Sequence, residues 1–154
     1  MKIKLTLTVL AIFTIHSCKT KPDLETEKKA LMVLHSKQKQ ANFEKNADML
    51  LENNSADFIE INRGEIISPR KNESKKRFRS YFDAVDFVKW DDITPPVFSF
   101  SDDITIATAA VNKLVVVKLK QENNKLDTAY FAWLAVYRKT NGKWEVHRIV
   151  STNK

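Results

Sequence analysis

The chain has 154 residues, a hydrophobic content of 43% and a formal net charge of +7. This length suits one domain, and the presence of only two glycines and four prolines excludes collagen-like, low-complexity and long-linker sequences. A single cysteine excludes an intramolecular disulfide bond. The sequence also lacks a Walker loop, a dinucleotide-binding fingerprint and a GxSxG motif, so we expect no bound cofactor.

The first part of the chain has the pattern of an export signal. Lys2 and Lys4 precede an apolar run over residues 5–15, and the run is followed by the chain's one cysteine, Cys18. A membrane-spanning helix needs about 20 apolar residues, so this run is too short to span a bilayer and is typical of a signal-peptide core. The segment IHSC resembles a bacterial lipobox, although His16 replaces the usual small residue.

This pattern predicts three parts in the chain: a lipoprotein signal peptide at 1–17, a polar tether at 18–27 and a folded domain at 28–154. Cys18 is the predicted lipidation site. Stable anchoring takes more than one acyl chain, because each buried CH₂ contributes only about 0.8 kcal/mol. We therefore expect a membrane-anchored lipoprotein of the cell envelope, on the periplasmic or outer-membrane side.

The sequence pI of about 9.5 raises the question of a nucleic-acid partner. The densest basic segment, PRKNESKKRFR at 69–79, alternates lysine and arginine with polar residues. We expect it to be the solvated face of a helix. An exported lipoprotein rarely meets nucleic acid, so we expect no nucleic-acid partner and regard anionic lipid headgroups as the better use of this charge.

Three segments have helical periodicity. The first runs over 24–43 with Asp23 as its cap, the second over about 45–52, and the third over 73–85. The third carries an aromatic stripe at i, i+3, i+4 and i+7, and Asn72 or Ser74 is its expected cap. The members of the stripe are Phe78, Tyr81, Phe82 and Val85.

The other segments favour strands. Residues 58–67 predict a hairpin that turns at 62–65, where Gly64 supplies a positive φ. From Phe87 onward the chain alternates, and Asn141-Gly142 predicts a further tight hairpin. In the long strand before residue 120 the apolar phase slips at Asn112-Lys113, which we interpret as a β-bulge.

Helices near the beginning and strands near the end predict an α+β fold, with the helices packed on one face of a sheet. The segment 130–136 is apolar on both faces, and the helices can cover only one of them. We therefore expect a homodimer that covers the second face, or a partner protein in the same place.

Three segments, DFIEINRGEI, SYFDAVDFVKWDDITPPVFSFSDD and WLAVYRKTNGKWEVHRIVST, resemble parts of the nuclear transport factor 2-like superfamily. This superfamily includes the ketosteroid isomerases and the SnoaL-like polyketide cyclases. The resemblance implies a cone-shaped SnoaL-like domain in which three N-terminal helices pack on a curved antiparallel sheet. It does not by itself imply a function, since this fold carries many.

Enzymes with this fold use a carboxylate base inside the cone, together with buried hydrogen-bond donors. The candidate bases in this chain are Asp57, which precedes the first strand, and His147 in the last strand. The other aspartates stand at expected caps and turns. The absence of a Cys–His cluster predicts that there is no metal site.

Several aromatic residues from different elements could converge inside the cone and bind a ligand, or could fill the core. These residues are Tyr81, Trp90, Tyr130, Trp133 and Tyr137. We favour a non-catalytic role, in which the domain binds a small apolar ligand or a partner protein. The alternative is an isomerase or cyclase of the ketosteroid isomerase or SnoaL type with an Asp or His base.

Overall fold

The computed structural model describes residues 23–154, so the expected signal peptide and Cys18 lie outside the described residues. The fold is α+β. In chain order the elements are α1 (Leu24–Phe43), α2 (Ala47–Leu51), β1 (Asn54–Asn62), β2 (Glu65–Ile67), α3 (Lys71–Ala84), β3 (Val85–Phe100), β4 (Ile106–Leu119), η1 (Lys120–Glu122), β5 (Lys125–Thr140) and β6 (Lys143–Asn153). Within the described part, no helix is both long and apolar enough to cross a membrane.

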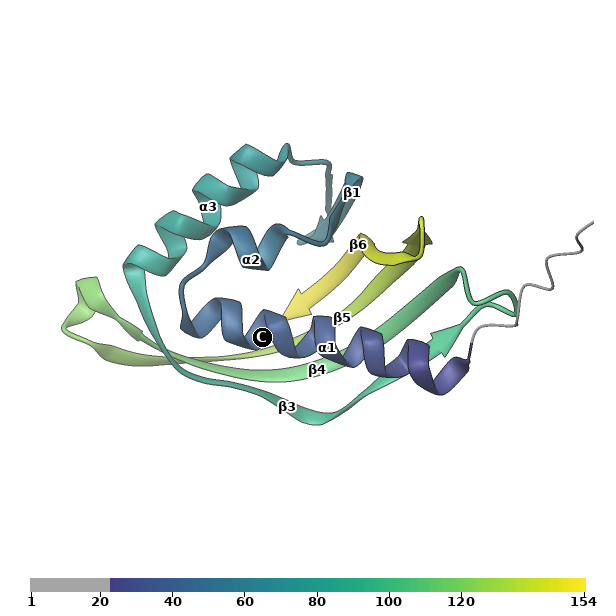
Figure 1. Ribbon diagram of the computed structural model, residues 1–154. Helices are drawn as coiled ribbons and strands as arrows, with labels where there is room; N and C mark the ends of the chain where they lie inside the picture. The colour runs from purple at the N-terminus through teal and green to yellow at the C-terminus, as the bar shows by residue number, and fades with distance from the viewer. Residues whose placement is uncertain (1–22) are drawn as a thin grey trace, which may run out of the picture.

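The strands form one curved sheet in the order β2-β1-β6-β5-β4-β3 (Figure 1). The hairpin β1–β2 joins this sheet beside the last strand, and β1 pairs with β6 in parallel. The expectation of a purely antiparallel sheet is therefore wrong for this pair. The reason is the chain path: β1 docks before α3 crosses to the opposite edge, and four antiparallel strands then lead back to β1.

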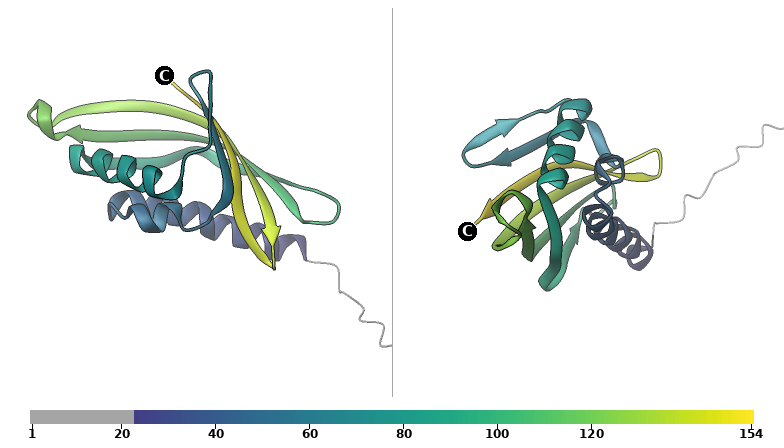
Figure 2. Two further views of the ribbon diagram at one scale, coloured as in Figure 1. Left: turned by 90° about the horizontal axis from the view of Figure 1, so that it is seen from above. Right: turned by 90° about the vertical axis from the view of Figure 1, so that its left-hand side faces the viewer.

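The helices gather on the concave side of the sheet, as Figures 1 and 2 show. Alternate residues of β4 point toward them and are buried, from Ala107 and Ala109 to Val115 and Val117. Leu31 of α1 packs in the same apolar core. The period of two along the strand thus separates a helix-facing interior from an outer face that the helices leave uncovered.

The signals at the ends of the elements are mostly as predicted. Asp23 caps α1 by accepting a 3.1 Å hydrogen bond from the Thr26 backbone N–H. Gly64 (φ 79°) and Gly142 (φ 79°) occupy the positive-φ positions of the two hairpin turns. The cap of α3 differs from the prediction: the helix begins earlier, with Arg70 at its N-cap and the Glu73 carboxylate accepting from the Arg70 backbone.

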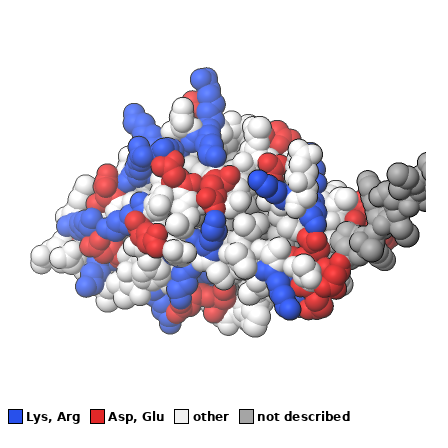
Figure 3. Space-filling model, viewed as in Figure 1, with Lys and Arg blue, Asp and Glu red and all other residues white. Residues whose placement is uncertain are grey.

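The basic segment forms the exposed side of α3. Lys75 pairs with Asp48 of α2 at 2.5 Å, and Arg77 pairs with Glu60 of β1 at 2.7 Å. Figure 3 shows cationic and anionic side chains interspersed over this side of the molecule. This charge pattern is the solvated helix face that the sequence predicts.

The predicted bulge at Asn112-Lys113 is wrong. The pairing between β4 and β5 continues without a break from Ile106 to Leu119. The apolar phase does not slip at this point, because Lys113 occupies an inward position in register with its apolar neighbours on β4. The irregularity lies on the facing strand instead, where the β3 register shifts between Asp92 and Thr94.

Candidate functional site

A cavity of about 240 Å³ lies between the three helices and the concave face of the sheet. Each helix and four of the strands contribute to its wall. The lining residues are Gln38, Asn42, Leu50, Leu51, Asn54, Phe58, Glu60, Asn62, Ser74, Arg77, Phe78, Trp90, Phe131, Trp133, Ile149 and Ser151. Clefts lined by apolar rings with a few polar groups are the ordinary form of a small-molecule site.

The polar groups of the wall are mainly amides and one ion pair. The Asn42 side-chain N–H donates to the Gln38 carbonyl oxygen at 2.7 Å, which fixes the orientation of one amide. Arg77 and Glu60 form an ion pair at 2.7 Å, and the Arg77 side chain is about half exposed, which places this pair where the wall meets solvent. The two charges lining the cavity therefore neutralise each other.

A charged side chain packs against two of the aromatic rings. Lys113 is 2% exposed, and its ammonium lies 5.7 Å from the ring centroid of Trp90 and 5.9 Å from that of Trp133. The three residues come from the neighbouring strands β3, β4 and β5. An ammonium at this distance from an indole face makes a cation–π contact.

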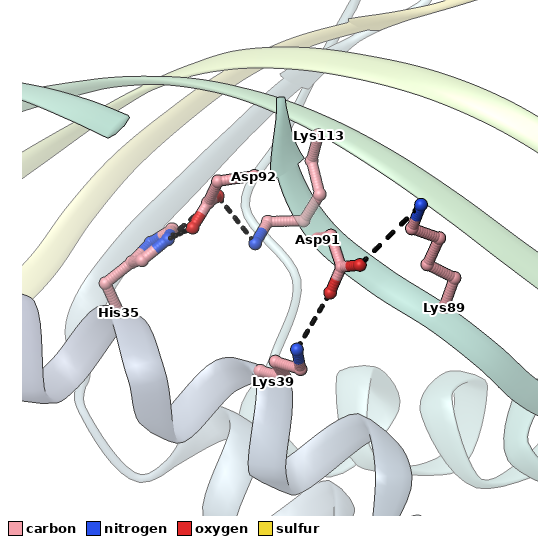
Figure 4. A network of polar contacts seen from close by, with 6 residues as sticks. All are labelled: His35, Lys39, Lys89, Asp91, Asp92 and Lys113. Atoms are coloured by element: carbon pink, nitrogen blue, oxygen red, sulfur yellow. Dashed lines mark hydrogen bonds and ion pairs between the residues drawn. The ribbon is translucent and has the colours of Figure 1, made fainter. Parts of the chain in front are cut away.

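Asp92, whose side chain is 29% exposed, and the buried His35 lie next to Lys113; we call Lys113, Asp92 and His35 the Lys113 cluster (Figure 4). Lys113 Nζ lies 2.7 Å from Asp92 Oδ1, and His35 Nε2 of α1 lies 2.9 Å from Asp92 Oδ2. A carboxylate only accepts, so His35 donates from Nε2. Burial acts to raise the pKa of Asp92, but the hydrogen bonds from Lys113 and His35 together hold it below its ordinary value.

The neighbouring carboxylate, Asp91, points the other way. It pairs with Lys39 of α1 at 2.8 Å and with Lys89 at 3.8 Å, and all three side chains are well exposed (Figure 4). Both adjacent aspartates thus tie β3 to α1. Of the two, Asp92 is the one that pairs with the buried Lys113.

Two of the five predicted ligand-binding aromatics, Trp90 and Trp133, line the cavity. Tyr137 instead is 1% exposed in the apolar core, where burial raises its pKa to about 12. Tyr81 and Tyr130 are exposed to a large extent and do not line the cavity. The structure therefore brings only the two tryptophans of the predicted set together.

The Trp90 ring carries a polar atom without a partner. Its Nε1 is buried and makes no hydrogen bond within residues 23–154. An indole N–H is a donor only, and a buried donor without an acceptor is costly.

The two predicted catalytic residues lie near each other but away from the cavity. His147 Nε2 is 3.4 Å from Asp57 Oδ1, and neither residue lines the cavity. Burial lowers the pKa of His147, while the Asp57 carboxylate acts in the opposite direction. Asp57 itself is largely exposed.

A bulge in β6 explains why His147 is buried. Val136 pairs with Arg148 and Tyr137 pairs with Val146, so His147 is the extra residue between them. Strict alternation along the strand would place Val146 and Val150 on the same face. The bulge reverses the phase, which turns Ile149 to the cavity and leaves Val150 exposed.

Simple pattern analysis missed the Lys113 cluster, although a signal was present. A lysine at an inward position of an apolar strand requires a buried counter-ion. The sequence interpretation placed Asp92 among turn residues and treated Lys113 as a break in phase. In the structure Asp92 stands within β3 as the direct cross-strand partner of Lys113.

Within residues 23–154, no group of three or more His, Cys, Asp or Glu side chains converges in a way that could hold a metal ion. The Lys113 cluster itself contains one carboxylate and an ammonium, which is not a donor set for a cation.

Comparison with solved structures identifies the fold. A nuclear transport factor 2-like superfamily protein from Salmonella enterica superposes with a TM-score of 0.70 at 10% identity, over 84% of this chain and 92% of that one. A protein of the same class from Cytophaga hutchinsonii gives 0.64 at 14% identity, over 81% and 96%. A ketosteroid isomerase-like protein from Erwinia carotovora atroseptica gives 0.62 at 14% identity, over 82% and 95%.

The chain therefore has the nuclear transport factor 2-like fold, as the sequence resemblance predicted. No family model matches the sequence. No curated protein matches it either. At these identities the likeness concerns the fold alone, and the function has to be argued from the cavity.

Proposed function

We propose that this domain binds a small, largely apolar ligand in the cavity between its helices and the concave face of the sheet, without catalysis. The single observation that carries the proposal is the cavity of about 240 Å³, walled by the rings of Trp90, Trp133, Phe58, Phe78 and Phe131. Apolar rings supply binding free energy through burial of ligand surface. The amides of Asn42 and its neighbours supply orientation.

The position of the ionisable groups favours binding over the isomerase or cyclase alternative. A general base must lie within hydrogen-bond reach of the proton that it removes. Asp57 and His147 do not line the cavity, and Glu60, the carboxylate that does, is paired with Arg77. Asp92 accepts from two donors, Lys113 and His35, and does not line the cavity.

The ligand-binding proposal is tested by calorimetric titration of the full chain, purified in detergent, with 2-methylnaphthalene. We expect saturable binding at one site. Asn62→Phe, which places a ring in the wall, should abolish it, whereas Glu65→Phe on the facing strand of the same hairpin should not, since Glu65 is exposed and outside the cavity. Equal binding by both variants, or no binding by the wild type, would overturn the proposal.

We also propose that Cys18 anchors the domain to a membrane of the cell envelope. The support is the order of Lys2 and Lys4, the apolar run and the cysteine. The folded part begins shortly after this residue, because Asp23 already caps α1. Helix α1 begins at Leu24 and so includes residues 24–27 of the expected tether. A lipidated Cys18 would therefore hold the domain close to the bilayer surface.

We further propose a homodimer through the outer face of the sheet. The apolar side chains of Val97, Leu134 and Val150 are 63%, 41% and 41% exposed, and they surround a shallow hollow with Ala110. The helices pack on the opposite face, so an intramolecular cover is missing among residues 23–154. A twofold pair would cover the same patch on both copies.

A further inference from the structure

We infer that the cavity selects anionic and neutral aromatic ligands against cationic ones, because a buried lysine of the protein already makes cation–π contacts with its two tryptophans. This inference rests on the proposed function and adds the charge class of the ligand. A pair of tryptophans in a cavity is otherwise a favourable site for an ammonium ligand, as in aromatic cages. Here the cation that contacts the two rings is Lys113, which is buried and does not line the cavity.

Lys113 contacts both tryptophan rings at once. Its ammonium lies 5.7 Å from the Trp90 centroid and 5.9 Å from the Trp133 centroid, and both rings line the cavity. In strand register Trp90 faces Val115 and Trp133 faces Val111, so Lys113 stands on β4 between their two partners. The rings therefore lie diagonally on either side of the lysine.

The ammonium cannot move away from the rings without cost. Lys113 is 2% exposed, and its counter-ion Asp92 is itself held by His35 of α1. A buried charge that loses its partner is strongly destabilising. The Lys113 cluster thus fixes the cation in place, whatever the cavity contains.

A cationic ligand would meet two unfavourable effects. The ring electrons that would attract it are already polarised toward Lys113, and the two positive charges would repel each other across the rings in a medium of low dielectric constant. The Asp92 carboxylate reduces this repulsion only in part, because it is already bound by Lys113 and His35. Arg77 and Glu60, the charges in the wall, cancel each other.

An anionic aromatic ligand would gain from the same arrangement. Its carboxylate is attracted by the Lys113 ammonium, and its ring can stack on indoles whose electron density is drawn toward Lys113.

The test uses three probes that share one ring system and differ in charge: 2-naphthoate, 2-methylnaphthalene and 2-naphthylmethylammonium. Calorimetric titration of the full chain should show that 2-naphthoate binds at least about tenfold more tightly than 2-naphthylmethylammonium, which corresponds to about 1.4 kcal/mol. The neutral probe should bind with intermediate affinity.

Variants of the Lys113 cluster assign the preference to its source. Lys113→Met should reverse the preference for the anionic probe, because the negative charge of Asp92 then remains near the rings without its counter-ion. The double variant with Asp92→Asn removes both charges and should bind the charged probes about equally. It also guards against misfolding of the single variant. Lys89→Met, an exposed lysine that also pairs with an aspartate, should keep the wild-type preference.

Each outcome separates this inference from the proposed function. If 2-methylnaphthalene binds and the two charged probes bind equally to the wild type, the cavity binds ligands but the charge selection is wrong. An unchanged preference in both Lys113 variants would overturn the role of this residue. If none of the three probes binds, the proposed function and the inference fail together.

Discussion

Lys113 on β4 and Asp92 on β3 are direct cross-strand partners, and the Lys113 ammonium lies 2.7 Å from the Asp92 carboxylate. The pair is unusual because it occupies the helix-facing side of an apolar strand. Replacing such a pair with apolar residues is often neutral for stability, whereas breaking it leaves one uncompensated buried charge. The presence of such a pair is therefore weak evidence that it adds net stability to the fold.

This relationship gives a prediction on stability. Lys113→Met should lower the free energy of unfolding by about 1–3 kcal/mol, because Asp92, whose side chain is 29% exposed, loses a charged hydrogen-bond partner and keeps only His35. The double variant with Asp92→Asn should recover a large part of that loss. Denaturant unfolding followed by circular dichroism measures both. Lys89→Met, at an exposed pair, should change stability by less than about 0.5 kcal/mol, and a similar effect of both single variants would contradict the prediction.

Glu27 fastens the beginning of α1 to the far strands of the sheet. Its carboxylate accepts from Trp144 Nε1 at 2.8 Å and pairs with Lys139 at 2.5 Å, and the hydrogen bond from Lys139 helps to hold the Glu27 pKa below its ordinary value. Glu27→Gln should cost about 1–3 kcal/mol, the usual contribution of charged hydrogen bonds. Glu25→Gln, in the same turn but exposed, is the control and should be nearly neutral in thermal denaturation.

His147 should make stability depend on pH. Burial lowers its pKa in the folded state below the ordinary value of about 6.5, so the unfolded chain binds the proton more readily. Stability should be greatest above about pH 6.5 and should fall as the pH drops from there toward the lowered pKa. The melting temperature of His147→Asn should fall less between about pH 7.5 and 5.5 than that of the wild type. Parallel curves would exclude this contribution.

The proposed dimer predicts that single charges on the outer face of the sheet split it. Sedimentation of the wild type at micromolar concentration should give a dimer, and Leu134→Lys or Val150→Lys should give a folded monomer, since a buried ammonium has no partner there. Leu126→Lys is the control, because Leu126 is exposed near the β4–β5 connection, outside the hollow around Leu134. A monomeric wild type would rule the homodimer out.

The proposed anchor predicts an acylated Cys18 at the amino terminus of the mature protein. Mass spectrometry of protein extracted from membranes measures this directly. Cys18→Ala should move the protein from the membrane fraction to the soluble fraction, because the acyl chains supply the binding free energy. A mature protein that retains Met1, or one cleaved at another position, would contradict the proposal.

The helices and hairpins were predictable because each has a local signal. Asp23 caps α1, and Gly64 and Gly142 permit the two tight turns. The parallel pairing of β1 with β6 was not predictable in this way, since it depends on the path of the chain and on residues far apart in sequence. The bulge at His147 also has no local mark, and it changed the face on which Ile149 and Val150 lie.

Part of the candidate site was predictable from residue type. Trp90 and Trp133 are large rings on strands, and they do line the cavity. Tyr81 and Tyr130 do not line the cavity, and the sequence could not show this because the presence of a ring on a helix or strand does not reveal which face is covered. Lys113 was misinterpreted because a charge in an apolar strand was taken to break the pattern, whereas its compensation comes from Asp92, on another strand.

The parallel contact between β1 and β6 has a consequence for the order of folding. Asn54 pairs with Val146, and Ile61 pairs with Val150, so an early strand finds its partner only in the last element of the chain. The backbone hydrogen bonds of α1 and α2 are local, so these helices do not have to wait for β6 to form. The wall that Phe58 and Ile149 share can close only when β6 has been made. Assembly of the cavity is therefore the final step for a chain that emerges from its N-terminus.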